Sequence, residues 1–416
     1  MKTVKELALR CRDASDILRC TPAQDKNAAL LFAAQLLDAN RDAIRAANVE
    51  DINAGRAAGL RESLLDRLLL TDKRIDGMIQ AAREVAEQRD PIGQVDSAVT
   101  QPNGLQILRK RVPLGVVGVI YESRPNVTIE IASLCLKSGN ACLLRGGKEA
   151  IHSNKILAAL FRDALAQTGL PMDAICLIED TARASAAEMM GLRGVLDVLI
   201  PRGGAALIQA ALDNAKMPVI ETGVGNCHIF VDEDADLDMA CNIVVNAKVS
   251  HPSVCNAAET LLVARPIADK FLPMLKKRLD ACRVALRGCP ETVAILGGDV
   301  SPATEEDWQE EYLDLILAVR VVAGLYQATA HISRYGTRHS EAIVTRNYFT
   351  AQRFFDRVDA AAVYCNASTR FTDGGQFGLG AEIGISTQKL HARGPMGLEA
   401  LTSVKYVVMG EGQIRE

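Results

Sequence analysis

Short apolar runs alternate with helix-length segments between residues 115 and 221, and this alternation constrains the fold more than any other feature. The runs are rich in valine, isoleucine and leucine, which is typical of strands covered on both faces. Segments long enough for crossover helices separate most of them, so the pattern predicts right-handed βαβ units and a parallel sheet. The expected strands are residues 115–120, 141–145, 175–178, 195–200 and 218–221.

Two further regions flank this segment. Residues 3–90 carry apolar positions at helical spacing, for example Leu30, Ala33 and Leu37, and predict a helical lobe. A second α/β segment begins near Asp232, and a chain of 416 residues is too long for one ordinary core. The second segment is expected to contain helices at 235–248 and 267–283 and strands at 260–263, 338–345 and 361–365.

Composition excludes several classes of protein. The formal net charge is -4 with no large block of one sign, which argues against nucleic acid or an anionic membrane as the main partner. No run approaches the ~18 apolar residues of a membrane span, and residues 1–18 lack the apolar core of a signal peptide. The 11 cysteines follow no disulfide or metal-binding spacing, so a cytoplasmic protein without a metal is expected.

Two glycine loops follow expected strands, Arg145-Gly146-Gly147-Lys148 and Arg202-Gly203-Gly204. Ligands bind at the carboxyl ends of parallel strands, and the amides of a following helix favour anions. The same dipeptides also mark ordinary tight turns, so these residues alone leave both interpretations open.

Cys255 differs from the other cysteines in its surroundings. It follows Pro252 at a break between an expected helix and an expected strand, where a thiol can reach a cleft and backbone amides can lower its pKa. Cys135, Cys142 and Cys241 lie in helical or apolar runs that are typical of packed thiols. The context alone still leaves a structural role for Cys255 open.

The motif segments resemble the γ-glutamyl phosphate reductases, a family of the aldehyde dehydrogenase superfamily. The resemblance runs nearly end to end, and one departure stands out, His251, where an arginine is expected. The segments that carry it are 246–248, 252–256 and 259–263 around Cys255, together with 113–127, 136–150, 221–232 and 366–401.

The resemblance implies an aldehyde-dehydrogenase-like α/β fold, with two parallel-sheet domains and a β-hairpin oligomerisation element. It implies that residues 1–98 and 113–231 bind NADP(H), that 232–385 carry the nucleophilic cysteine, and that 99–112 with 386–416 form the oligomerisation element. The implied reaction is NADPH-dependent reduction of L-glutamyl 5-phosphate to L-glutamate 5-semialdehyde with release of phosphate, the second step of proline biosynthesis from glutamate. A thiolate suits this reaction because it is both a reactive nucleophile and a good leaving group.

The resemblance also implies roles for individual residues. Cys255 is the expected nucleophile and Asn126 an oxyanion donor, although Asn126 also fits a simple Pro-Asn turn. Glu221 matches a water-activating glutamate but is not expected to be an efficient hydrolytic base here. Two cations, Arg145 and Lys148, suit the 2′-phosphate of NADP(H). The other expected cofactor residues are Gly146, Gly147, Arg202, Gly203, Gly204 and Glu311, and the expected carboxylate-binding residues are Arg124, Thr369 and Arg370.

Other interpretations remain open at this stage. The chain could be a hydrolytic NAD(P)-dependent aldehyde dehydrogenase acting on an amino-acid semialdehyde, or a nucleotide-binding scaffold with a structural cysteine. It could also be the reductase portion of a bifunctional synthase, but it begins directly in the helical lobe. A separate glutamate 5-kinase is therefore a candidate partner, and a homo-oligomer is expected from the hairpin element.

Overall fold

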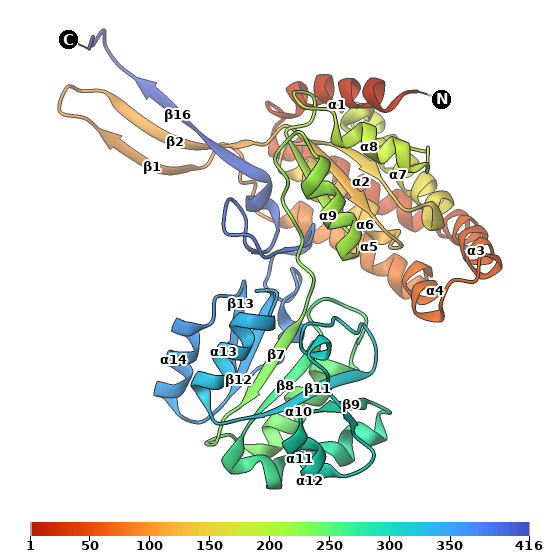
Figure 1. Ribbon diagram of the computed structural model, residues 1–416. Helices are drawn as coiled ribbons and strands as arrows, with labels where there is room; N and C mark the ends of the chain where they lie inside the picture. Colours follow the sequence, from red (N-terminus) through yellow and green to blue (C-terminus); the bar gives the residue numbers. More distant parts are fainter. Residues whose placement is uncertain (1, 416) are drawn as a thin grey trace. The chain divides into compact units, whose positions relative to one another are not determined.

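The computed structural model describes residues 2–415, which form two compact units (Figure 1). The first unit comprises the chain up to Thr222, Gly378–Gly384 and the segment from Met396. The second unit comprises Gly223–Phe377 and Ile385–Pro395. The chain therefore crosses between units after Thr222, earlier than the domain boundary expected after residue 231.

The first unit contains a four-stranded parallel sheet in the order β5-β4-β3-β6. Its central strand β3 is buried at every position, which explains the unbroken apolar run in the sequence. The strands are β3 (Val116–Tyr121), β4 (Ala141–Arg145), β5 (Ile175–Leu177) and β6 (Val198–Arg202). The expected strand at 218–221 is reduced to a bridge between Leu199 and Val219.

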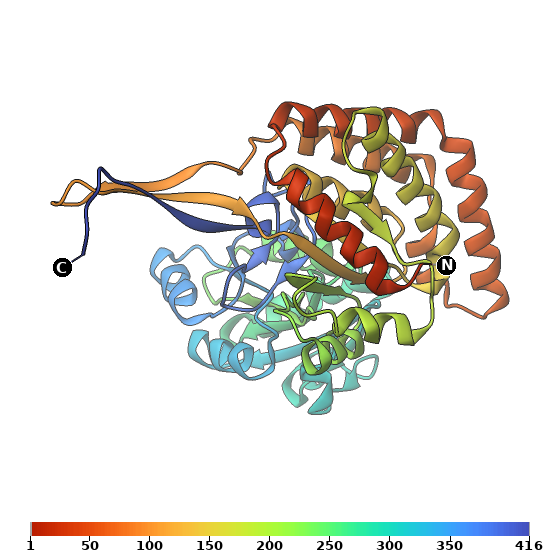
Figure 2. The same ribbon diagram turned by 90° about the horizontal axis from the view of Figure 1, so that it is seen from above.

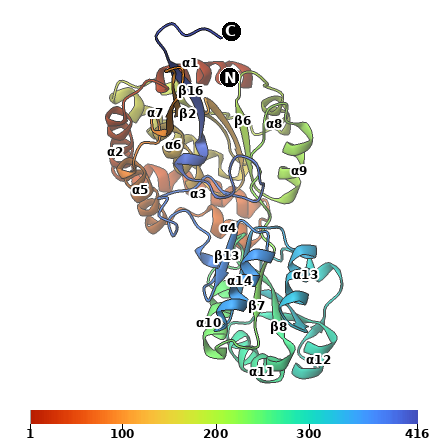
Figure 3. The same cartoon turned by 90° about the vertical axis from the view of Figure 1, so that its left-hand side faces the viewer.

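Helices cover both faces of this sheet, with α2, α5 and α7 on one flank and α8 and α9 on the other (Figure 3). The helical region predicted for residues 3–90 is confirmed. The helix α1 begins with a capping box between Thr3 and Glu6. The helices are α1 (Val4–Leu18), α2 (Ala23–Ala39), α3 (Arg41–Ala57), α4 (Glu62–Leu68), α5 (Asp72–Glu87), α6 (Asn126–Lys137), α7 (Ile151–Gln167), α8 (Arg183–Met190) and α9 (Ala205–Asn214).

An antiparallel arm of three strands projects from the first unit (Figures 1 and 2). It consists of β1 (Val95–Thr100), β2 (Gln106–Pro113) and the C-terminal β16 (Thr402–Met409), with β2 in the middle. All residues of β1 are exposed, as are Tyr406 and Val408 on β16. The arm thus presents two open edges and exposed apolar side chains, which are features of a surface that pairs with another chain.

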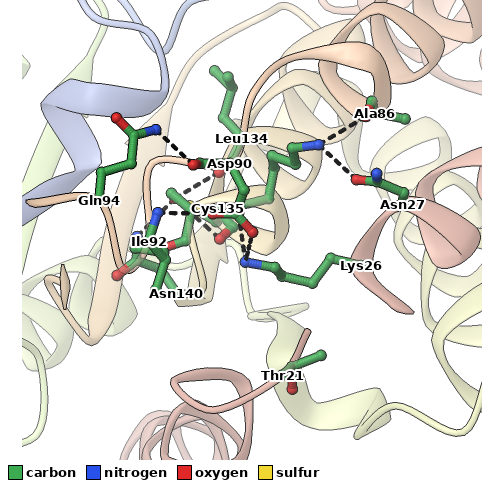
Figure 4. A network of polar contacts seen from close by, with 12 residues as sticks. Thr21, Lys26, Asn27, Ala86, Asp90, Ile92, Gln94, Leu134, Cys135 and Asn140 are labelled. Carbon is green, nitrogen blue, oxygen red and sulfur yellow. Dashed lines mark hydrogen bonds and ion pairs between the residues drawn. The ribbon is translucent and has the colours of Figure 1, made fainter. Parts of the chain in front are cut away.

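A buried polar network fixes the turn from which the arm leaves (Figure 4). The ammonium group of Lys26 lies 2.6 Å from Asp90 and donates a hydrogen bond of 3.0 Å to the carbonyl of Lys137. The side chain of Lys137 in turn donates to Asn27 at 2.6 Å, and Asp90 accepts from the N–H of Ile92 at 2.8 Å. Because both lysines are almost fully buried and have partners, α2, α6 and the segment before β1 are held together.

The second unit contains a seven-stranded sheet in the order β10-β9-β11-β8-β7-β12-β13, with parallel pairing throughout. The strand β7 pairs with β8 and β12, which is why residues 227–231 belong to this unit. The strands are β7 (Cys227–Val231), β8 (Ala258–Ala264), β9 (Ala285–Gly288), β10 (Ser301–Pro302), β11 (Ile316–Val322), β12 (Ser340–Val344) and β13 (Ala362–Cys365). A small hairpin, β14 (Ile385–Ser386) and β15 (Gly394–Pro395), completes the unit.

Helices cover both faces of the seven-stranded sheet as well (Figure 3). The larger core packs α10 and α11 against one face, and a smaller core around Phe230 and Phe354 packs α13 and α14 against the other. The helices are α10 (Leu237–Val249), α11 (Arg265–Ala281), α12 (Pro290–Leu296), α13 (Leu325–Tyr335) and α14 (Tyr348–Arg357). Among residues 2–415, no helix combines the length and apolarity needed to cross a membrane.

Candidate active site

The two glycine loops of the first unit lie at one edge of its sheet. Arg145 at the end of β4 pairs with Ile120, and Arg202 at the end of β6 pairs with the next residue, Tyr121. The structure therefore places the expected cofactor residues of this unit at the carboxyl ends of β4 and β6, the strands on either side of β3, where ligands of parallel sheets bind. They are Arg145, Gly146, Gly147, Lys148, Arg202, Gly203 and Gly204.

The three cations of these loops have different surroundings. Arg145 donates to the carbonyl of Thr181 at 2.8 Å, and Arg202 donates to the carbonyl of Ile383 at 2.7 Å. Lys148 is exposed at the start of a short 3-10 helix. Arg145 and Arg202 thus also hold neighbouring segments, whereas Lys148 is exposed and its charge is accessible to an anion.

Glu122, which the sequence did not single out, follows β3 directly, and its carboxylate lies at the N-terminus of α9. Its carboxylate accepts a hydrogen bond of 3.1 Å from the N–H of Gly204, and a Cβ atom at Gly203 would lie 2.6 Å from it. The next residue, Ser123, has a φ of 39°, an uncommon conformation for a residue with a side chain. The N-cap residue of α9, Gly204, has no side chain with which to cap the helix, so the first amides of α9 suit an anion, and a cofactor phosphate there would have to share this helix end with Glu122.

The first unit also holds Arg124, Asn126 and Glu221, each partly buried. Asn126 is the first residue of α6, and its amide donates a hydrogen bond of 2.7 Å to Glu130. Glu221 precedes Thr222, whose hydroxyl is fixed by the carbonyl of Pro201 at 2.8 Å. The roles expected for these three residues stay predictions.

In the second unit, Cys255 lies on the turn between α10 and β8 and is partly exposed. The turn is closed by a hydrogen bond of 3.0 Å from the N–H of Ala257 to the carbonyl of Val254. The buried thiol of Cys227 donates to the carbonyl of Cys255 at 3.1 Å. Gly225 approaches so closely that a Cβ atom there would lie 1.6 Å from the same carbonyl oxygen. The backbone of Cys255 is therefore held from the β7 side.

The segment 366–372 holds the same turn from another side. The hydroxyl of Thr369, which is fully buried, donates to the carbonyl of Asn256 at 2.7 Å, and the Asn256 amide donates to the carbonyl of Thr372 at 2.9 Å. The guanidinium of Arg370 hydrogen-bonds the Asn256 side chain and donates to Ser250 at 3.1 Å. Thr369 and Arg370 thus contact residues of the turn that carries Cys255, and their expected role in binding the substrate carboxylate stays a prediction.

Burial lowers the pKa of Arg370, while the negative charges of Asp373 and of the Cys255 thiolate oppose that shift. Such a guanidinium stabilises a thiolate more than a thiol, which favours a nucleophilic cysteine.

Glu311 belongs to the same group of loops. Its carboxylate accepts a hydrogen bond of 2.8 Å from the N–H of Gly225, the residue that abuts Cys255. An acid in the run 305–311 could have been merely solvated, but the fold places this one close to the backbone of Cys255. Among residues 2–415, no group of three His, Cys, Asp or Glu residues could hold a metal ion.

Residues 2–294 match the family model described as the aldehyde dehydrogenase family. A solved propionaldehyde dehydrogenase from Rhodopseudomonas palustris shares the fold with a TM-score of 0.73 at 16% identity over 98% of this chain and 97% of that chain. The chain therefore belongs to the aldehyde dehydrogenase family.

Within that family the chain belongs with the γ-glutamyl phosphate reductases. It is 58% identical to the γ-glutamyl phosphate reductase of Moorella thermoacetica over 98% of this chain and 97% of that protein. The crystal structure of γ-glutamyl phosphate reductase from Thermotoga maritima matches this fold with a TM-score of 0.95 over the whole of both chains, and the two sequences are 52% identical.

Proposed function

We propose that the protein is an NADPH-dependent oxidoreductase that converts L-glutamyl 5-phosphate to L-glutamate 5-semialdehyde in the cytoplasm, releasing phosphate. The observation that carries the proposal is the arrangement of Cys255, a partly exposed thiol on a turn held from two sides and flanked by Arg370. The relatives at 58% identity support the same reaction.

The residues divide the chemistry among them. The Cys255 thiolate attacks the acyl carbon and forms a thioester as the C–O bond to phosphate breaks, and backbone or Asn126 N–H groups stabilise the oxyanion. NADPH supplies the hydride that reduces this thioester. The resulting thiohemiacetal then collapses, so that the aldehyde leaves and the Cys255 thiolate is restored. Glu221 is proposed to contribute little to hydrolysis, since water attack on the thioester would waste substrate.

The cofactor residues fit a dinucleotide phosphate. The glycine loops follow the carboxyl ends of two strands, one of them at the N-terminus of α9, and Lys148 supplies an exposed cation for a 2′-phosphate. Glu311 is proposed to bind the nicotinamide ribose, and Arg145, Arg202 and the loop glycines to line the nucleotide site. Arg124, Thr369 and Arg370 are proposed to face the substrate carboxylate. The exposed arm supports a homo-oligomer, and the short-lived acyl phosphate favours direct supply by a glutamate 5-kinase.

The test is the reverse reaction, NADP⁺ reduction with glutamate 5-semialdehyde, measured with and without inorganic phosphate. Phosphate-dependent turnover that is lost in Cys255→Ala is the expected result. Turnover without phosphate would assign the protein to the hydrolytic dehydrogenases, and turnover surviving in Cys255→Ala would remove Cys255 from the mechanism.

A further inference from the structure

A second cysteine, Cys227, contacts the backbone of the proposed nucleophile. Cys227 is the first residue of β7 and is fully buried. Its sulfur lies 3.1 Å from the carbonyl oxygen of Cys255, close for a hydrogen bond from a thiol. Two residues earlier, Gly225 leaves no room for a side chain against the same carbonyl. The Cys255 carbonyl is therefore packed closely against two residues of this segment, Gly225 and Cys227.

A chain of buried polar groups continues from Cys227 back to the nucleophile turn. The Cys227 sulfur lies 3.7 Å from Nδ1 of His339, which lies 2.8 Å from the hydroxyl of Ser340. That hydroxyl lies 2.6 Å from the hydroxyl of Thr372, and the Thr372 carbonyl accepts the Asn256 amide. Cys227 and Thr372 thus hold adjacent residues of the turn, Cys255 and Asn256, and are joined to each other through His339 and Ser340.

The protonation state of Cys227 suits a donor. Burial, followed by the negative charges of Glu341 and Cys255, raises the pKa of the Cys227 thiol well above its ordinary value. The thiol therefore keeps its proton at neutral pH. A thiolate at this position could not donate to the carbonyl and would repel the negative charge of ionised Cys255.

We infer that Cys227 is a positioning residue whose thiol holds the Cys255 carbonyl and so orients the sulfur and the N–H of Cys255 toward the substrate. The N–H, the Cβ and the carbonyl carbon of Cys255 share one Cα atom, so fixing the carbonyl restricts where the other two groups can point. Small displacements of a nucleophile have large effects on rate. This inference rests on the proposed role of Cys255 as the nucleophile.

The test compares Cys227→Ala with Cys227→Ser, in which a hydroxyl replaces the thiol as donor. Cys241→Ala is the matched control because it removes another buried thiol of the same unit that lies outside this network. Each protein is assayed for kcat and KM, for thermal unfolding, and for the rate of Cys255 alkylation by iodoacetamide as a function of pH, followed by mass spectrometry.

In Cys227→Ala we expect kcat to fall roughly five- to tenfold with KM within about twofold of wild type, as for loss of one hydrogen bond felt in the transition state. The apparent pKa of Cys255 alkylation should rise, because a looser turn weakens the attraction between Arg370 and the thiolate. Cys227→Ser should recover most of the activity and the alkylation profile, and Cys241→Ala should resemble wild type in both.

Two results would overturn the inference. One is Cys227→Ala with wild-type kcat and alkylation profile; the other is equal loss in Cys227→Ala and Cys227→Ser, which would assign the residue to packing alone. The alkylation measurement needs no substrate, so it tests the positioning separately from the reaction. Activity that survives Cys255→Ala would remove Cys255 from the proposed mechanism, whereas inactivity of Cys255→Ala beside an unaffected Cys227→Ala would refute only the inference.

Discussion

The ammonium group of Lys248 lies 2.6 Å from a carboxylate oxygen of Glu259, and both side chains are fully buried. The other Glu259 oxygen accepts a hydrogen bond of 3.3 Å from the N–H of Leu313, which has a φ of 53° and lies two residues after Glu311. Burial raises the pKa of Glu259 to about 7 and lowers the pKa of Lys248, because each charge is costly in this environment. The pair therefore connects the helix before Cys255 to the loop that carries Glu311.

Removing one member of this pair should lower the free energy of unfolding more than removing both. Lys248→Met leaves Glu259 buried without its partner, and we expect it to lower the free energy of unfolding by about 3–5 kcal/mol. The double variant Lys248→Met/Glu259→Leu should recover much of that loss because no uncompensated charge remains. Denaturant unfolding at pH 8 measures both values. A double variant less stable than Lys248→Met would show that the ion pair itself stabilises the fold.

The exposed cation Lys148 should set the cofactor preference. Lys148→Ala is expected to raise KM for NADPH by roughly tenfold while leaving KM for NADH nearly unchanged, because only NADPH carries the 2′-phosphate. Lys155→Ala is the control, since Lys155 is an exposed lysine on the following helix that pairs with Glu179 at 2.7 Å. Equal effects of Lys148→Ala on both cofactors would place the 2′-phosphate elsewhere.

His331 should make the protein sensitive to acid. Burial, aided by the positive charges of His228, Arg320 and Arg334, lowers the pKa of His331 to about 2 from its ordinary 6.5. The unfolded chain therefore binds a proton that the folded chain does not, so His331 contributes stability above pH 6.5 that is lost as the pH falls toward 2.

His331→Asn keeps an acceptor near the position of Nδ1, where Arg320 donates at 3.0 Å, but does not titrate. Between pH 7.5 and pH 5, this variant should lose about 2 kcal/mol less stability than wild type. Chemical denaturation at the two pH values measures the difference. If the free energy of unfolding fell by the same amount in wild type and His331→Asn between pH 7.5 and pH 5, His331 would be protonated in the folded state.

Kinetics can decide whether Thr369 holds the turn of Cys255 or binds the substrate carboxylate. Its buried hydroxyl donates to the carbonyl of Asn256, so we expect Thr369→Val to lower kcat by about tenfold through the nucleophile turn. Thr369→Ser, which keeps the hydroxyl, should stay close to wild type. A large rise in KM for the substrate with unchanged kcat would instead indicate that Thr369 binds the substrate carboxylate.

The arm should be needed for assembly. Val408→Lys places a charge among the exposed apolar residues of β16, and we expect it to shift the protein toward smaller species in light scattering coupled to size exclusion. Leu31→Lys, at an exposed apolar position on α2, is the control and should leave the assembly unchanged. Identical masses for wild type and Val408→Lys would exclude this face of the arm as an interface.

The sequence predicted the elements whose pattern is local. The buried run of β3 and the glycine loops after β4 and β6 could be recognised because periodicity and turn chemistry are properties of neighbouring residues. The expected strand at 218–221 did not form beyond one bridge, and β7, β9, β10 and β11 were not identified. The strands β9 and β10 are only 4 and 2 residues long and gain their order from their neighbours in the sheet, whereas the apolar runs of β7 and β11 were simply missed.

In the candidate site, too, some residues could be recognised from local sequence and others only from the fold. Cys255, Thr369 and Arg370 could be named from motifs, but the contact between Cys227 and the Cys255 carbonyl joins residues 28 positions apart in the chain. The sequence around Cys227 is that of an ordinary buried cysteine, and the sequence around Glu122 is that of an ordinary surface acid. Only the fold brings them to a nucleophile and to a helix N-terminus.

Gly225 links two parts of the candidate site through contacts of its main chain. Its N–H is bound by the Glu311 carboxylate, and its Cα rests against the carbonyl of Cys255. A side chain at position 225 would therefore disturb the hydrogen bond to Glu311 and the turn of Cys255 together. Both contacts converge on one residue, so the position of the Glu311 carboxylate and the position of the Cys255 backbone depend on each other.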